Sequence, residues 1–160
     1  MRLRGLQLDF RVREVYEVYE VLKEIAAGTA DAMVDGMMVE QERTFFSQLR
    51  DTLNLDNVNV GGHSMGGGTT FRLLQTAPPD GYEAMPVKHA ISLDPWLPPF
   101  EFADERPKNK GPFPPSLSIN SQEYTEWEPH FSQVVEASKA MGASFVTVPG
   151  MTREYNDFRG

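Results

Sequence analysis

The 160-residue sequence contains no cysteine, only three histidines and only two tryptophans. Without cysteine the chain can form neither a disulfide framework nor a thiolate metal site. The histidines, at positions 63, 89 and 130, are too widely separated in the sequence to suggest a zinc site. We therefore expect no metal and no other cofactor.

Positive charge is also scarce, because 15 Lys and Arg residues stand against 23 Asp and Glu residues, for a formal net charge of -8. A surface of that sign disfavours nucleic acid and adsorption to anionic membranes. The first residues are cationic but lead into Asp9 and Arg11, with no apolar run long enough for a signal peptide or a transmembrane span. If Met1 is the true start, the sequence predicts a cytoplasmic protein; otherwise the compartment stays open.

A chain of this length is predicted to be one domain, 1–160, that can bury a core. Two helices are expected in its first third, at about 11–27 and about 38–53. The first is expected to end at Gly28. Its apolar positions recur at spacings of three and four: Val15, Val18, Leu22 and Ile25.

Short apolar or β-branched runs later in the chain predict strands, separated by segments with helical spacing. The strands are expected at 58–60, 89–93, 116–120 and 144–148, and a further helix at 129–141. Strands that alternate with helices favour an α/β fold with a parallel sheet.

The most informative stretch is 58–68, where a β-branched run ends in Gly62-x-Ser64-x-Gly66 and passes into a helix-compatible segment. A strand, a sharp turn carrying a serine and a helix together form the nucleophile elbow of serine hydrolases. Glycine is expected on both sides because a Cβ atom there would collide with the strand or the helix. Ser64 is the candidate nucleophile, and the backbone N–H of Met65 is the candidate donor to an oxyanion. The glycine spacing fits no phosphate-binding loop.

A second strand leads directly into Asp94 and Pro95. In open parallel sheets, ligands bind outside the carboxyl ends of the strands, so an acid at this position is placed for chemistry. Asp94 is therefore the candidate acid that orients a base, in the chain order Ser then Asp of hydrolases with this elbow. Taken alone, Asp94 would suit the opening of a turn before Pro95 better.

The three histidines are poor candidates for the base. His63 lies inside the elbow, where its ring cannot reach the neighbouring hydroxyl, and is expected to pack or to hydrogen-bond. His89 begins a strand, at the wrong end of the sheet for catalysis. His130, the only histidine after Asp94, is expected at an exposed helix start.

The segment 95–115 holds seven of the twelve prolines and several aromatic side chains. At the catalytic rim such a loop suits a lipid-facing lid. It suits a packed crossover equally well. The sequence leaves both interpretations open.

With these residues in place, the chain resembles the plasma and intracellular type II platelet-activating-factor acetylhydrolase family of α/β hydrolases. The resemblance rests on four segments in matching order: 62–67 (GHSMGG), 90–96 (AISLDPW), 118–124 (SINSQEY) and 150–158 (GMTREYNDF). It implies the C-terminal part of an α/β-hydrolase fold, with about four parallel strands and flanking helices. It also implies a calcium-independent esterase that removes a short or oxidised sn-2 acyl group from a phospholipid, with Ser64 as nucleophile and Asp94 as acid.

The base that the resemblance implies is a histidine a few residues after the last strand. Here the register is kept only with a gap between Thr152 and Arg153, and without the gap Arg153 occupies the position. A guanidinium stays protonated and cannot act as a base. The resemblance therefore implies an esterase impaired in this chain or, alternatively, a non-catalytic lipid-binding or partner-binding remnant.

Family members also have strands before the first helix seen here, and a loop after one of them donates the second oxyanion N–H. Without those strands the elbow strand becomes a sheet edge with an uncovered apolar face. An incomplete sequence, a shortened paralogue without catalysis, or a half-protein completed by a partner would each account for this. The last predicts an oligomer through the elbow-strand edge. A general carboxylesterase would share the elbow, but not the segment Leu93-Asp94-Pro95-Trp96.

Overall fold

The computed structural model describes residues 2–29, 48–50, 52–97 and 112–150. Within them, four parallel strands form one sheet in the order β1-β2-β3-β4, as the predicted α/β class requires. The strands are β1 (Val58–His63), β2 (Val87–Leu93), β3 (Ser116–Ser121) and β4 (Ser144–Val148). All four predicted strands are confirmed, and β1 and β2 are longer than their patterns indicated.

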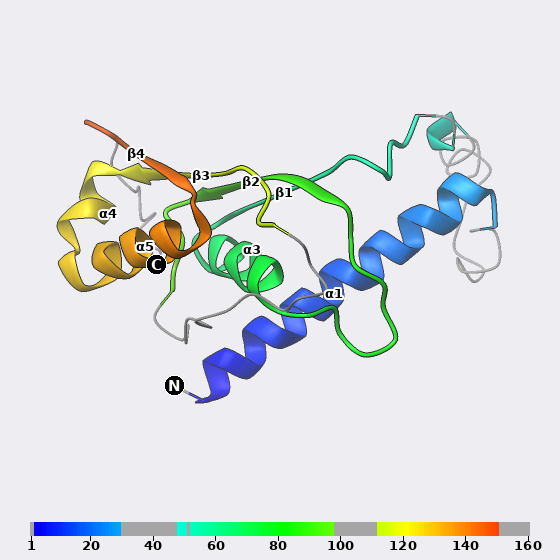
Figure 1. Cartoon of the computed structure of the whole chain (residues 1–160), viewed down its shortest axis with the longest axis horizontal. Helices are drawn as coiled ribbons and strands as arrows, with labels where there is room; N and C mark the ends of the chain where they lie inside the picture. Colours follow the sequence, from blue (N-terminus) through cyan, green and yellow to red (C-terminus); the bar gives the residue numbers. More distant parts are fainter. Residues whose placement is uncertain (1, 30–47, 51, 98–111, 151–160) are drawn as a thin grey trace, which may run out of the picture.

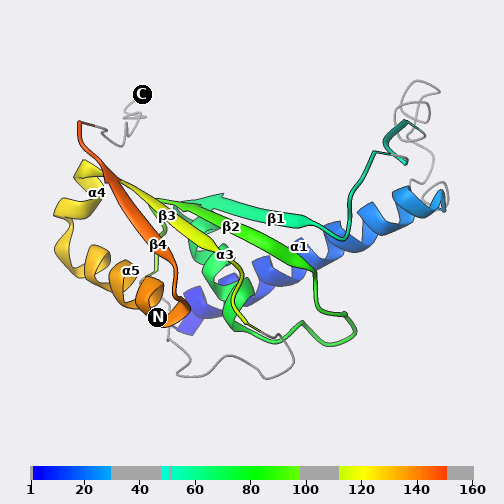
Figure 2. The ribbon, with the colours of Figure 1, turned by 45° about the horizontal axis from the view of Figure 1, so that its top comes forward.

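The described helices are α1 (Arg2–Ala27), α3 (Met65–Gln75), α4 (Gln122–Glu126) and α5 (Glu128–Met141). Figures 1 and 2 show α1, α3 and α5 on the same side of the sheet. The helix predicted at 129–141 is confirmed, whereas the one-turn helix α4 was not predicted. The helix predicted at 38–53 lies mostly outside the described residues.

Helix α1 packs against α3 and differs from the prediction in two respects. It begins at Arg2 rather than near Arg11, and Val18, one of the apolar positions that recur along the predicted helix, is 59% exposed rather than part of the core. The residues that contact the core lie on a neighbouring line of the helix: Leu8, Val12 and Tyr16. Since α1 carries two apolar stripes, the sequence alone did not show which one meets α3. Gly28, at φ 72°, ends the helix as predicted.

The two faces of the sheet differ in a way that the sequence pattern did not indicate. The face toward α3 and α5 carries small or polar buried residues, among them Ala90, Ser92, Ser118 and Asn120. The strand register places larger aliphatic residues on the other side, which we call the open face: Ile91, Leu93, Leu117, Ile119, Val146 and Val148. No described helix covers the open face, and Ile91 is 47% exposed there. In the described part of the chain, β1 is one of the two edge strands, as expected, and β4 is the other.

Candidate active site

Ser64 lies on the sharp bend between β1 and α3, in a backbone conformation that side-chain-bearing residues rarely adopt. Its φ and ψ are 55° and -118°. Among the described residues, only Ser64 and Asp94 combine a side chain with positive φ, and Asp94 has φ 40°. Such conformations cost on the order of 1–3 kcal/mol each and cluster at functional sites. The strand, bend and helix have the arrangement expected of a nucleophile elbow.

The glycines around Ser64 have different roles. A Cβ atom on Gly62 would lie 2.2 Å from the carbonyl carbon of Gly66, so this position admits only glycine. Cβ atoms on Gly67 and Gly68 would lie 2.8 Å from Pro95 and 2.5 Å from the Trp96 carbonyl oxygen, respectively. At Gly66 a Cβ atom would meet nothing within 4 Å. The expectation that both motif glycines are sterically required therefore holds for Gly62 and is wrong for Gly66, which faces open space.

Backbone hydrogen bonds hold the elbow against the end of β2. The Ser64 amide donates to the Leu93 carbonyl oxygen over 2.9 Å, and the Ser64 carbonyl oxygen accepts from the Trp96 amide over 2.8 Å. The Ser64 carbonyl also accepts from the Gly68 amide over 3.1 Å, which starts helix α3. Ser64 and Asp94 are thereby brought to the carboxyl ends of adjacent parallel strands, the edge where open α/β sheets bind ligands. Met65, the first residue of α3, follows directly.

Asp94 is 5% exposed, and both of its carboxylate oxygens accept hydrogen bonds from one residue, Ser121. The Ser121 amide donates to Oδ1 over 2.7 Å, and the Ser121 hydroxyl donates to Oδ2 over 2.8 Å. The same hydroxyl accepts from the Tyr124 amide over 3.2 Å and so caps α4. The Tyr124 hydroxyl in turn donates to the Pro95 carbonyl oxygen. The sequence reasoning missed Ser121, although a serine directly before a helical segment is a typical N-cap signal.

The positions of the three histidines agree only in part with the predictions for them. His63 is exposed on the same side of the sheet as the open face. The His89 Nδ1 atom lies 2.9 Å from the Asn59 side-chain oxygen, away from the carboxyl end of β1. His130 is partly buried on α5 rather than exposed, and its ring stacks on Trp127 with centroids 3.3 Å apart. Burial lowers the pKa of His130 from its ordinary value.

Gly150, the last described residue, follows β4 and lies close to the Asp94 site. The amide of Gly150 donates to the side-chain oxygen of Gln122 over 2.8 Å, and Gln122 directly follows Ser121. Thr152 and Arg153, where the base was sought, lie outside the described residues. So do residues 98–111 of the proline-rich loop. The described ends of that loop pack inward, since Pro95 and Leu97 are fully buried and Phe113 contacts the core.

A groove of about 480 Å³ lies beside the elbow, along the free edge of β1. We call it the edge groove. Its lining comes from three elements: Arg11, Glu14, Val15 and Val18 of α1, Asn59, Val60 and Gly61 of β1, and Gly66, Thr69, Thr70 and Leu73 of α3. The edge groove therefore runs along the flank of the sheet rather than above the strand ends where Ser64 and Asp94 lie.

The described residues contain no group of three or more His, Cys, Asp or Glu side chains that could hold a metal ion. In the same part of the chain, no helix is both long enough and apolar enough to span a membrane.

Comparisons with known proteins show which family the chain matches and which solved structure has a similar fold. The family model described as platelet-activating factor acetylhydrolase, isoform II, matches residues 1–158. No curated protein matches. The crystal structure of a variant of SOBER1 from Arabidopsis thaliana is similar in fold, with a TM-score of 0.51 and 15% sequence identity. That similarity covers 90% of this chain and 55% of the Arabidopsis chain, so this chain spans about half the length of that protein.

Proposed function

Because the chain belongs to the platelet-activating factor acetylhydrolase, isoform II, family, we propose that its site is that of a serine esterase acting on short or oxidised sn-2 acyl groups of phospholipids. Ser64 attacks the ester carbonyl carbon, the amide of Met65 donates to the resulting oxyanion, and Asp94 orients the base. The base takes the proton of the Ser64 hydroxyl and gives it to the departing alkoxide, which leaves as an alcohol, and water later releases the acyl group from Ser64 as the free acid.

One observation carries this proposal: Ser64 and Asp94 lie at adjacent strand ends, each at positive φ, joined by backbone bonds on both sides of Ser64. Strain at two neighbouring positions persists only where the surroundings hold it in place. Gly67 and Gly68 contribute to these surroundings. Because they have no Cβ atom, they let α3 pack closely against Pro95 and Trp96 in the segment after β2.

The proposed esterase is impaired, because the sequence has no histidine after position 130. Loss of the base from a serine triad lowers kcat by roughly 10⁶-fold. The hydroxyl of Ser64 then reacts only at the residual rate that the oxyanion donors and binding provide.

A fluorophosphonate probe tests the nucleophile directly on the purified protein. We expect slow labelling at Ser64 that added imidazole accelerates, since imidazole supplies the missing base. Ser64→Ala should abolish the labelling, and Ser116→Ala, at a half-buried serine outside the site, should not. Labelling that is equally fast in Ser64→Ala, or that is absent where a full-length relative is labelled, would refute the proposal.

Restoring the base gives a second arm of the test. Arg153→His introduces an imidazole at the position where the resemblance to the family implies a histidine. We expect this variant to hydrolyse a phospholipid with an sn-2 acetyl group faster than the parent chain, at least tenfold. An unchanged rate in a folded variant would show that the base is not the missing component.

The second candidate is a non-catalytic remnant that binds a lipid or a partner, including a second copy through the edge of β1. In the part of the chain that the structure describes, no strand lies on the outer edge of β1 and no helix covers the open face, and both observations favour this candidate. It predicts that Ser64→Ala leaves binding and oligomeric state unchanged. Size-exclusion chromatography coupled to light scattering distinguishes a monomer from an oligomer.

A further inference from the structure

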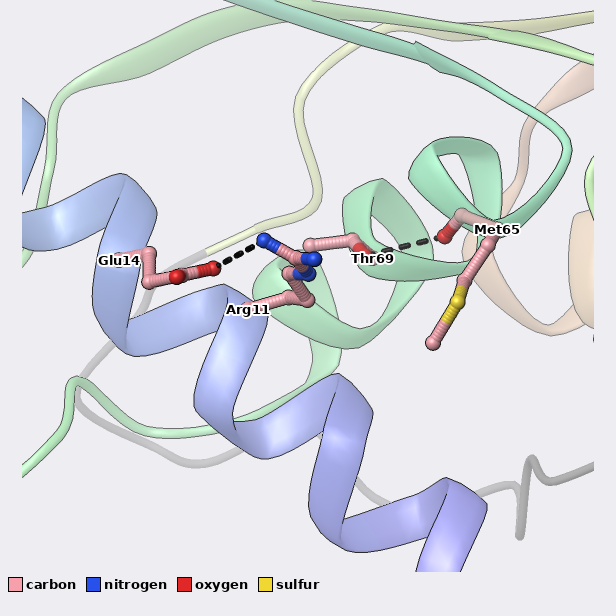
Figure 3. Close-up of polar contacts among 4 residues, drawn as sticks. All are labelled: Arg11, Glu14, Met65 and Thr69. Carbon is pink, nitrogen blue, oxygen red and sulfur yellow. Dashed lines mark hydrogen bonds and ion pairs between the residues drawn. The ribbon is translucent and has the colours of Figure 1, made fainter.

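Each of the three groups assigned to the proposed esterase has a contact that holds it in place. Backbone bonds to the end of β2 and to the segment after it hold the bend at Ser64. The Thr69 hydroxyl donates over 3.0 Å to the carbonyl oxygen of Met65, the proposed oxyanion donor, and Figure 3 shows this bond. Ser121 binds both carboxylate oxygens of Asp94. The group that remains is the base, which the resemblance places after β4.

The first residue of α4, Gln122, contacts the segment in which the base is expected. Its side-chain oxygen accepts from the amide of Gly150, the second residue after β4, over 2.8 Å. Its neighbour in the chain is Ser121, which binds Asp94. α4 contacts both β3 and β4, and Figure 2 shows it at the end of the sheet where these two strands finish. Two consecutive residues therefore connect the acid to the segment after β4.

The side-chain amide of Gln122 has one orientation that satisfies both of its partners. Its nitrogen donates over 3.1 Å to a carboxylate oxygen of Glu126, one helical turn later. An ionised carboxylate only accepts hydrogen bonds, and a backbone amide only donates them. The nitrogen must therefore face Glu126, and this turns the oxygen toward the Gly150 amide. The acceptor for Gly150 is thus fixed from within α4.

The bond to Gly150 limits where the next residues can lie. Consecutive Cα atoms are about 3.8 Å apart, so the Cα atom of Arg153 lies within about 11 Å of the Gly150 Cα atom. A base must come within hydrogen-bond reach of its partners, about 2.6–3.2 Å between heavy atoms. A misplacement of about 1 Å can lower the rate by about 10²-fold. A contact that anchors the chain three residues before the base position therefore matters for the reaction.

We propose that Gln122 is a positioning residue: its side-chain oxygen holds the start of the segment after β4 beside Ser121 and so sets the distance between Asp94 and a base carried at position 153. This role rests on the esterase chemistry proposed above. The contact is present in this chain although no histidine follows position 130. A base restored by Arg153→His is therefore held near the acid.

The test measures the pKa of the imidazole introduced by Arg153→His, by NMR titration of the purified chain. A carboxylate within about 4–6 Å raises the pKa of an imidazole. We expect a rise of at least about one pH unit above the ordinary value of about 6.5. Asp94→Asn should remove this rise, which identifies the carboxylate responsible. The readout does not involve the Ser64 hydroxyl, so it gives an answer whether or not Ser64 reacts.

Two uncharged substitutions in the Arg153→His background separate positioning from a merely structural role. Gln122→Met keeps the length of the side chain but replaces its oxygen with a weakly accepting thioether, and it should remove most of the rise in pKa. Thr125→Ala removes the hydroxyl that donates to the Gln122 carbonyl oxygen over 2.7 Å. It disturbs α4 to a similar degree without touching the acceptor for Gly150, so the rise should remain.

Labelling of Ser64 by the fluorophosphonate probe gives a second readout in the same variants. Gln122→Met should slow the labelling of Arg153→His at least about fivefold, because a misplaced base lowers the rate. Thr125→Ala should leave the labelling rate unchanged.

The parent chain supplies a measurement that needs no introduced histidine, and this decides the matter if Arg153→His does not fold. Amide hydrogen exchange at Gly150 should be at least about threefold faster in Gln122→Met than in the parent chain, because the bonded amide is freed. Exchange at Gly142, whose amide donates to the Lys139 carbonyl oxygen, should stay the same.

Three results would overturn the proposed role of Gln122. An ordinary imidazole pKa in folded Arg153→His would show that position 153 does not lie beside Asp94. A raised pKa that persists in Gln122→Met would show that another contact sets the distance. Unchanged exchange at Gly150 in Gln122→Met would show that the side-chain oxygen does not hold this segment. A rise that depends on Gln122 without any labelling of Ser64 would support the role of Gln122 and refute Ser64 as the nucleophile.

Discussion

Alanine at Gly62 should destabilise the protein and alanine at Gly66 should not, although both glycines flank Ser64 in one motif. The Cβ atom of Gly62→Ala would lie 2.2 Å from the Gly66 carbonyl carbon and 2.7 Å from the Gly67 nitrogen. Favourable carbon–carbon contacts need about 3.5–4.0 Å, so the start of α3 must move by more than about 1 Å. The bonds from Ser64 to Leu93 and Trp96 resist that movement.

Overpacking costs about 1–3 kcal/mol and occasionally more; because the colliding atoms here are backbone, we expect at least 3 kcal/mol for Gly62→Ala. Gly66→Ala meets nothing within 4 Å and replaces glycine in a helix, which is worth up to about 1 kcal/mol.

Equilibrium unfolding in urea measures both variants, and thermal unfolding should give a Tm change of about 2–4 °C per kcal/mol for a chain of this size. A loss of about 3 kcal/mol then corresponds to a decrease in Tm of at least about 6 °C for Gly62→Ala. We expect Gly66→Ala to leave Tm unchanged or to raise it slightly. Equal effects of the two substitutions would refute the elbow geometry described here.

Two further predictions concern the acid and the partly buried histidine. Ser121→Ala removes a donor to a buried carboxylate and the cap of α4, so unfolding in urea should show a loss of about 2–3 kcal/mol; a loss no larger than that of Ser116→Ala would contradict the role of this hydroxyl. Because burial lowers the pKa of His130, the unfolded chain binds more protons below about pH 6.5 and stability falls as the pH drops through that value. His130→Gln should lessen the difference in unfolding free energy between pH 7.5 and pH 5.5, and an unchanged difference would assign it to other groups.

The strands were predictable because their signals are local. β-Branched and aliphatic runs such as 144–148 indicate strands from their own residues, and their alternation with helices favours a parallel sheet. The meeting of Ser64 and Asp94 also followed from the sequence, since each comes directly after a strand and the carboxyl ends of parallel strands share one edge. The roles of both residues in catalysis stay predictions.

Features that depend on which elements meet were not predictable. Ser121 holds Asp94 because β3 lies beside β2, a pairing that no property of Ser121 itself indicates. Val18 is exposed because α3 covers the other apolar stripe of α1. Gly66 is free of steric constraint because no element lies above the first turn of α3 in the described residues. In each case, a residue pattern allowed two arrangements and the tertiary contact decided between them.

The contacts that fasten the serine bend to its neighbouring strand run from main chain to main chain, through Leu93 and Trp96. Every amino acid except proline carries those atoms, so other replacements of the reactive side chains do not delete them. The bend and its contacts with the neighbouring strand can consequently persist when the side chains that do the chemistry are replaced. For chains of this kind, resemblance in form records ancestry, and only reaction with a substrate or probe records present activity.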